Sequence, residues 1–269
     1  KNNNIKIVVS GSVVDINRVG FGLGLKVINF NDIPTKGYSK DIKDITAVTR
    51  LTAPFSTIIF KPFMVDNIIF NNLGLSNEQI VNYNFIDPLI WLKDFKLDIN
   101  YIKKEIPKIN YDKPIVVVRE EEFKASYVNK RYDFLDKALE EFENWDINLI
   151  IIPRYDSIHL KKRFKKAIIL EKKIILQHLL AISNLFIGGG GTINTEATYF
   201  GVPVISTRSF ITHYDKFLID NKLMVHSNNT IEIINLAKEL ILKDNKTIAN
   251  SVFSKMKLDI DNFVDKIIN

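Results

Sequence analysis

Four consecutive glycines, Gly188–Gly191, are followed directly by Thr192 and then, one helical turn later, by Glu196. Glycine has no Cβ, so this backbone can approach a ligand closely and can adopt positive φ angles. A helix that starts here directs its N–H groups and the positive end of its dipole at an anion. Thr192 is a suitable N-cap, and the Glu196 carboxylate, on the same side of the helix, can accept hydrogen bonds from a ribose diol. The run therefore predicts a phosphate-facing turn, against the simpler alternative of a tight turn before a capped helix.

Further polar residues stand where predicted strands end, and ligands of parallel sheets bind outside the carboxyl ends of the strands. Arg119 can neutralise a phosphate or a sugar carboxylate, or it can be a surface arginine paired with the acidic run Glu120–Glu122. That run could include a general acid or base, but we interpret it as a solvated loop. Asp32 and His213 are the candidates for a catalytic base. The candidate binding residues are Ser10, Gly11, Arg119, Arg154, Gly188, Gly189, Gly190, Gly191, Thr192 and Glu196; Glu171 and Thr207-Arg208 also follow strands but receive no role.

We expect no cofactor and no metal ion. The chain has no cysteine, which excludes disulfides and zinc–thiolate sites. No two of its four histidines have metal-ligand spacing. The glycine run does not fit the GxGxxG pattern with an acidic residue about 20 positions later, so NAD is not favoured.

The elements that must position these residues alternate between strands and helices in the second half of the chain. Such alternation is typical of βαβ units around a parallel sheet, and strands that are apolar throughout indicate a sheet covered on both faces. The predicted strands are 114–118, 147–152, 167–170, 184–187 and 202–206, and the predicted helices are 131–142, 174–182, 192–200, 213–221 and 230–243.

The first half follows the same pattern with shorter elements. Strands are predicted at 5–9, 26–30, 57–60 and 80–82, and helices at 13–21 and 64–73. The charged stretch 94–113, which carries Pro107, is the predicted linker. We expect a remnant of an N-terminal Rossmann-like domain over residues 1–108, a C-terminal nucleotide-binding Rossmann-like domain over 109–250, and a last amphipathic helix over 251–268 that crosses back to the first domain.

Composition narrows the class of partner. Apolar residues make up 46% of the chain and charged residues 25%, which is typical of a soluble globular protein. The net charge of +6 suits an anionic small ligand, an acidic membrane surface or nucleic acid. The basic cluster at 161–166 has no interleaved aromatic residues, so a solvated face is favoured over nucleic-acid binding. We expect a cytoplasmic protein with peripheral membrane contact at most.

Several segments together resemble an archaeal and bacterial family known as domain of unknown function 354. They include the glycine run, the pair Glu196-Ala197 and the sequence Gly-Val-Pro-Val-Ile-Ser at Gly201–Ser206. Further segments that resemble the family in the same order are 20–34, 50–59, 86–92 and 117–128.

That family is similar to the GT-B superfamily of nucleotide-sugar glycosyltransferases and UDP-GlcNAc 2-epimerases. The resemblance implies two Rossmann-like domains, of which the first would be incomplete at its N-terminus because a full one begins before Ile5. It further implies that the turn at Gly190–Thr192 contacts a diphosphate and that Glu196 holds the ribose. Epimerases have a His-Arg pair where this chain has Val118-Arg119.

The expected function is metal-independent transfer of sugar from a nucleotide-sugar, expected to be UDP-linked, to an unknown glycan or lipid-linked acceptor. A sugar-nucleotide epimerase or hydrolase is the second hypothesis, and a non-catalytic or degenerate binding protein is the third.

Overall fold

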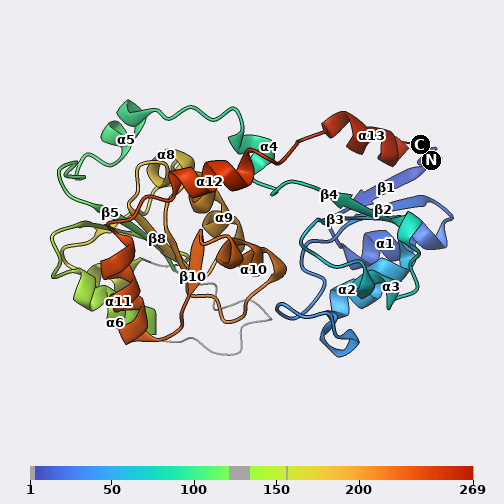
Figure 1. The fold of residues 1–269 in the computed structure, drawn as a ribbon, viewed down its shortest axis with the longest axis horizontal. Coiled ribbons are helices and arrows are strands. Elements are labelled where there is room, and N and C mark those ends of the chain that lie inside the picture. Colours follow the sequence, from blue (N-terminus) through green and yellow to red (C-terminus); the bar gives the residue numbers. More distant parts are fainter. Residues whose placement is uncertain (1–3, 121–133, 156, 269) are drawn as a thin grey trace. The chain divides into compact units, whose positions relative to one another are not determined.

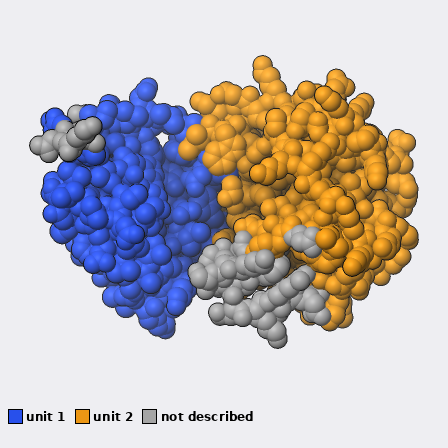
Figure 2. Space-filling view, turned by 180° about the vertical axis from the view of Figure 1, so that it is seen from behind, with its two compact units in different colours: residues 1–89, 210–216, 256–269 blue, residues 90–209, 217–255 orange. Residues whose placement is uncertain are grey.

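The computed structural model describes residues 4–120, 134–155 and 157–268. The chain forms two compact units (Figures 1 and 2). Unit 1 contains residues 1–89, 210–216 and 256–269, and unit 2 contains residues 90–209 and 217–255. The first passage between the units therefore lies at residues 89–90, earlier than the predicted boundary at 108–109.

Unit 1 is built on a four-stranded parallel sheet. Its strands are β1 (Ile7–Ser10), β2 (Lys26–Phe30), β3 (Ile58–Pro62) and β4 (Ile80–Tyr83), and they lie side by side in chain order. The helices between them are α1 (Val14–Gly22), α2 (Ala47–Thr52) and α3 (Ile68–Asn71). The predicted helix at 64–73 is thus only four residues long. It ends before Gly74, which has a φ of +91°.

Successive side chains of a strand point to opposite faces of a sheet, and β3 illustrates this in unit 1. Ile59 packs in a buried cluster with Ile69 and Phe70 of α3. Phe60 points the other way and meets Phe263 of α13 (Ile260–Ile268), with ring centroids 4.9 Å apart. The last helix of the chain therefore covers the second face of the unit 1 sheet.

Unit 2 is built on a six-stranded parallel sheet with the order β10-β9-β8-β5-β6-β7. The strands are β5 (Ile115–Arg119), β6 (Asn148–Ile152), β7 (Ile168–Ile169), β8 (Leu185–Gly188), β9 (Val204–Ser206) and β10 (Met224–His226). The described helices from residue 89 to 255 are α4 (Leu89–Leu92), α5 (Ile99–Glu105), α6 (Phe134–Phe142), α7 (Ile158–Arg163), α8 (Leu176–Leu180), α9 (Gly191–Tyr199), α10 (His213–Asp220), α11 (Thr230–Leu240) and α12 (Lys246–Phe253). Of these, α4 and α10 contain a passage between the units.

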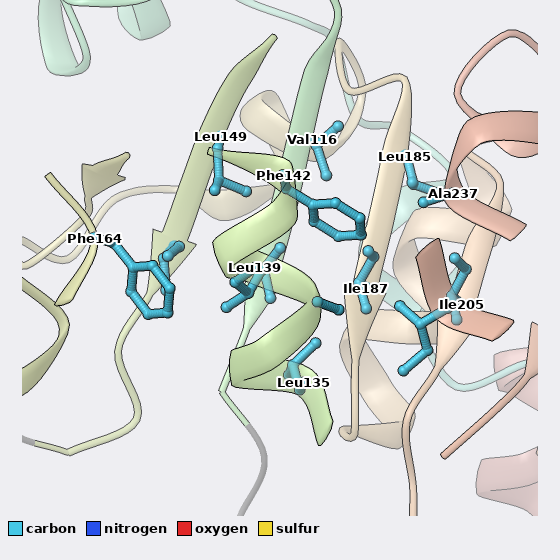
Figure 3. Close-up of a cluster of buried hydrophobic side chains, with 14 of the residues drawn as sticks. Val116, Leu135, Leu139, Phe142, Leu149, Phe164, Leu185, Ile187, Ile205 and Ala237 are labelled. Carbon is cyan, nitrogen blue, oxygen red and sulfur yellow. The ribbon is translucent and has the colours of Figure 1, made fainter. Parts of the chain in front are cut away.

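The core of unit 2 lies between its sheet and the helices α6 and α11 (Figure 3). Every second residue of β5, Val116 and Val118, enters this cluster, where Phe142 of α6 is fully buried. Val117 points to the opposite face, where α9 packs on β8 and β9. The continuous apolar strands are thus explained by helices on both faces.

The C-terminal segment differs from its prediction. The single amphipathic helix expected over 251–268 is two helices, because α12 ends at Phe253 and α13 begins at Ile260. The Asp259 carboxylate accepts a hydrogen bond from the Asn262 N–H (3.1 Å) and so starts α13 as a separate helix. Strand β10, three residues long, was not predicted at all. None of the helices in the described ranges is long and apolar enough to cross a membrane.

Candidate functional site

The strand order of unit 2 reverses between β5 and β8. From β5 the chain adds β6 and β7 on one side, and then it adds β8, β9 and β10 on the other. In open parallel sheets, ligands bind outside the carboxyl ends of the strands at such a switch point. The register pairs Arg119, the last residue of β5, with Gly188, the last residue of β8. The structure therefore brings the predicted arginine and the predicted glycine turn together.

The glycine turn leads directly from β8 into α9. Gly190 is the N-cap of the helix and supplies no side-chain cap, so the first N–H groups of α9 keep their capacity to bind an anion. The prediction that Thr192 caps the helix is wrong, because the helix begins one residue before it; Thr192 is exposed in the first turn. The run also does not use the left-handed conformation that glycine permits, since none of its four residues has a positive φ.

Two of these glycines let neighbouring side chains pack closely against the backbone of the turn. A Cβ on Gly188 would lie 3.0 Å from the Phe186 ring and 3.4 Å from Cβ of Arg119. A Cβ on Gly191 would lie 3.0 Å from Nη1 of Arg208. The guanidinium of Arg208, two residues beyond β9, is thus packed against the first residue of α9.

The sequence places Arg208 directly after a predicted strand but indicates no role for it. Its guanidinium and the N-terminus of α9 are both positive, and two positive groups held together favour an anion beside them. The backbone of Arg208 is fixed as well, since its carbonyl oxygen lies 2.7 Å from Nε2 of His226.

Glu196 lies in α9 with its residue surface 5% exposed. Its Oε1 accepts hydrogen bonds from Nε1 of Trp91 (2.8 Å) and from Nε2 of Gln177 (2.9 Å). Both donors belong to unit 2, and they fix the orientation of the carboxylate. Oε2 makes no hydrogen bond to a described residue and is not a fully buried atom, so it keeps its capacity to accept from a ligand hydroxyl.

The polar residues beyond β5 form a connected group. Nη1 of Arg119 donates to the carbonyl oxygen of Pro153 (2.7 Å). Glu120 is 8% exposed; its Oε2 accepts from the Arg154 N–H (2.8 Å), and its Oε1 lies 3.1 Å from Nε2 of His159. The interpretation of Glu120 as part of a solvated loop is wrong, because these partners bury it; Glu121 and Glu122 lie outside the described residues. The side chain of Arg154 is exposed.

Two predicted binding residues lie at the end of β1 in unit 1. The Ser10 hydroxyl donates to the side-chain oxygen of Asn17 in α1, so it serves the packing of the helix. Gly11 is exposed with open space around its Cα. Ser12, not Gly11, takes the left-handed conformation of this turn, with a φ of +57°.

Asp32, a candidate base, is exposed after β2. It lies close enough to Tyr83 and Asp87, at the end of β4, to raise the pKa of both. Burial is the main cause of each shift, and the Tyr83 hydroxyl donates to Oδ1 of Asp87 (2.9 Å). Asp87 is thus a second carboxyl group within electrostatic range of Asp32, and the sequence pattern does not predict it.

His213, the other candidate base, is the first residue of α10 and is 2% exposed. Its Nε2 lies 3.1 Å from the Thr35 hydroxyl, and the Tyr38 ring packs edge-on against it at 5.1 Å between centroids. Burial lowers the pKa of His213, and the backbone of Ser39 and Met64 opposes this. Burial therefore disfavours the protonated form of the imidazole. In the described parts of the chain, no three His, Cys, Asp or Glu side chains are grouped to hold a metal ion.

Known structures share this fold over nearly the whole chain. The UDP-GlcNAc 2-epimerase of Methanocaldococcus jannaschii, in complex with UDP-GlcNAc and UDP, matches with a TM-score of 0.66 at 15% identity, over 98% of this chain and 77% of that one. Anabaena HepE in complex with UDP-glucose matches with a TM-score of 0.61 at 13% identity, over 98% and 77%. These matches confirm the predicted fold class of two Rossmann-like domains of the GT-B type.

The sequence of this chain is similar to that of an archaeal protein. An uncharacterised protein of Methanocaldococcus jannaschii is 29% identical over 245 residues, which is 87% of this chain and 67% of that protein. The model of the family described as "Protein of unknown function (DUF354)" matches residues 1–269. The chain therefore belongs to the DUF354 family, as its glycine run and the Gly201–Ser206 motif predict.

Proposed function

We propose that unit 2 binds a nucleotide-sugar and that the protein transfers the sugar to an acceptor. The observation that carries the proposal is the packing of the Arg208 guanidinium against the N-terminus of α9 at the switch point of the sheet, where Arg119 ends the neighbouring strand. Such positive groups stabilise the charge that develops on a leaving diphosphate, and they do so without a metal ion. UDP-sugar complexes of proteins with this fold support a uridine nucleotide as the first ligand to test.

Within this proposal each part of the ligand has a partner. The diphosphate lies at the glycine turn between the two arginines, and the ribose hydroxyls reach Oε2 of Glu196. The sugar acceptor is an unknown glycan or lipid-linked intermediate. Asp32 and His213 in unit 1 remain the proposed candidates for the base that takes the acceptor proton.

Binding is tested by thermal unfolding in the presence of UDP, GDP, CDP and their sugars. A ligand at 100 times its Kd stabilises the protein by about 2.7 kcal/mol. We expect a uridine nucleotide to raise the melting temperature and uridine alone to do so much less. If no nucleoside diphosphate stabilises the protein, the proposal fails.

Arg208→Met is expected to weaken UDP binding by roughly tenfold to a hundredfold, because a charge-assisted contact to the diphosphate is lost. Isothermal titration calorimetry measures this effect. Arg18→Met is the matched control, since Arg18 is an exposed arginine of α1 that packs over Phe55 in unit 1. Equal UDP affinities of the Arg208 variant and the control would contradict the assignment of Arg208.

Glu196→Gln is expected to weaken UDP by about tenfold and to leave the binding of inorganic pyrophosphate nearly unchanged. The amide keeps one oxygen for Trp91 and Gln177, so the fold is preserved, but it loses the negative acceptor for the ribose. A parallel loss of affinity for both ligands would show that Glu196 acts on the whole turn and not on the nucleoside.

An epimerase or hydrolase is the second candidate, and the neighbouring carboxyl groups Asp32 and Asp87 favour it because both reactions need acid and base groups. Mass spectrometry and NMR of the sugar after incubation with UDP-GlcNAc distinguish the reactions. A changed configuration at C2 indicates epimerisation, free sugar indicates hydrolysis, and turnover only with added acceptor indicates transfer. Binding without turnover under all of these conditions would favour a non-catalytic protein.

A further inference from the structure

A cavity of about 460 Å³ lies in unit 1, outside the glycine-turn site of unit 2. It opens at the carboxyl end of the unit 1 sheet, where ligands of parallel sheets bind. Lys61 from β3 and its register partner Asn82 from β4 contribute to the wall. Tyr38, Asp66 and His213 complete the polar part of the lining. The volume is in the range of about 300–1,000 Å³ that small-molecule sites occupy.

Lys61 is the unusual member of this lining. The residue is 1% exposed, and its Nζ makes a single hydrogen bond to a described residue, the carbonyl oxygen of Val65. An ammonium group has three N–H donors, so two of them have no acceptor among the described residues. A buried charge is costly unless it is paired and hydrogen-bonded.

Asp66, the carboxylate that acts on Lys61, does not supply that pair. Asp66 Oδ2 accepts from Nζ of Lys40 at 2.5 Å, and Asp66 Oδ1 accepts from the Ile68 N–H at 3.1 Å. Asp66 acts on Lys61 only at longer range, where it opposes the effect of burial on the lysine pKa. Lys61 therefore presents a buried ammonium to the cavity with most of its hydrogen-bonding capacity unused.

His213 presents the complementary group. The Thr35 hydroxyl has one hydrogen, and it donates to the carbonyl oxygen of Gly37 (2.9 Å), which can only accept. The His213 Nε2 must then be the donor to the Thr35 oxygen. In a neutral ring this leaves a lone pair on Nδ1, an atom that is fully buried and has no hydrogen bond in the described structure.

We propose that this cavity binds a small hydroxylated anion, a sugar acid or a sugar phosphate, with its oxyanion on the ammonium of Lys61 and a hydroxyl donating to Nδ1 of His213. The Nδ1 lone pair and the Asp66 carboxylate both repel an oxyanion, so they direct the charged end of the ligand to Lys61. The exposed Tyr38 ring and the exposed Asn82 residue in the lining suit the apolar face and the remaining hydroxyls of a sugar ring.

The test is calorimetric titration of the full chain with glucuronate, with glucose 6-phosphate and with neutral glucose. We expect at least one of the two anions to bind and glucose to bind at least tenfold more weakly. Binding of glucuronate alone identifies the site as one for sugar acids, and binding of the phosphate ester alone as one for sugar phosphates. No binding of either anion, or equal binding of glucose, would overturn the proposal.

Two variants locate the site. Lys61→Met should reduce the affinity for the anion more than tenfold, and His213→Gln, whose amide can still donate to Thr35, should reduce it less. Lys43→Met is the matched control, because Lys43 is an exposed lysine outside the cavity. An unchanged affinity of the folded Lys61 variant would refute the assignment. UDP binding to unit 2 should be unchanged in the Lys61 and Lys43 variants, so a failure of this test can be told apart from a failure of the nucleotide test.

The pH dependence gives an independent readout. Burial lowers the pKa of Lys61 to about 8, so glucuronate should bind more than tenfold more weakly at pH 9.5 than at pH 7, as the ammonium loses its proton. The other titratable groups around the cavity are Tyr38, Lys40, Asp66 and His213, with Lys216 over the Tyr38 ring. The Lys61→Met variant carries all of them, so the difference between the two proteins isolates Lys61. A pH profile that is the same with and without Lys61 would contradict the proposal.

Discussion

Gly201→Ala is expected to destabilise unit 2 by roughly 3 kcal/mol or more. Gly201 follows the last turn of α9 with a φ of +75°, a conformation that costs an L-residue free energy. A Cβ there would also lie 2.5 Å from Cα and 2.6 Å from the backbone nitrogen of Lys246, at the start of α12. Backbone atoms cannot turn aside as a side chain can, so α12 must move away from α9.

The hydrogen bonds around Gly201 explain why a glycine stands there. Its N–H donates to the Thr198 carbonyl oxygen and the next N–H, of Val202, donates to that of Ala197, so the chain leaves α9 and turns into β9. The Gly201 carbonyl oxygen in turn accepts from the Asn245 N–H. Gly201, the first residue of the Gly201–Ser206 motif, thus connects the end of α9 to β9 and to the residue before α12. The same helix, α9, begins at the glycine turn.

Differential scanning calorimetry measures the change, and a loss of about 3 kcal/mol lowers the melting temperature by about 6–12 °C for a unit of this size. The control is Gly190→Ala at the other end of α9, where a Cβ meets nothing within 4 Å and φ is −96°. That variant should cost about 1 kcal/mol or less, since an alanine is a poorer N-cap than glycine. A Gly201 variant as stable as the Gly190 variant would refute the packing argument.

The site in unit 2 shows what the sequence could predict. The glycine run and Arg119 meet because each directly ends a strand of a parallel sheet. The ends of these strands can be predicted because each strand is a short apolar run in the sequence. The contact of Glu196 with Trp91 joins residues 105 positions apart in the chain, and that of Arg208 with Gly191 joins the ends of two neighbouring strands; no spacing rule gives either side-chain contact. Glu120 was misinterpreted for the same reason, because its burial depends on the Arg154 backbone and on His159 after the next strand.

The secondary structure also divides into elements that neighbouring residues predict and elements that they do not predict. Strands such as Ile115–Arg119 follow from β-branched runs, whereas β10 is too short to give a periodic signal. The break between α12 and α13 depends on Asp259, which caps a new helix within a sequence that is amphipathic on both sides. Lys61 is the clearest case: a lysine at the end of a strand is normally exposed, and its burial arises because the chain at Val65 folds back over it.

Lys61→Met is expected to stabilise unit 1 at pH 7 in the absence of ligand, by roughly 2 kcal/mol. Burial lowers the pKa of Lys61 from 10.5 to about 8. Each pKa unit corresponds to about 1.4 kcal/mol, so the buried ammonium costs about 3 kcal/mol, of which the lost hydrogen bond to Val65 offsets about 1 kcal/mol. Methionine fills a similar volume and carries no charge.

The sign of the pH dependence follows from linkage. Between pH 8 and 10.5 the unfolded chain binds more protons at Lys61 than the folded chain, so the stability of the unaltered protein rises with pH in this window. The advantage of Lys61→Met should therefore be fully present below pH 8 and should shrink as the pH approaches 10.5. Urea unfolding of both proteins at pH 7, 8.5 and 10 gives the difference in the free energy of unfolding.

Lys43→Met, at an exposed position, should change stability by less than about 0.5 kcal/mol at every pH. A Lys61 variant that is less stable than the unaltered protein at pH 7 would show that the ammonium is already compensated within unit 1. A variant that is more stable, and that also fails to bind the anion, would show that Lys61 destabilises the empty fold in order to hold a charged ligand. Such a loss of stability at a binding group is the usual cost of a functional site.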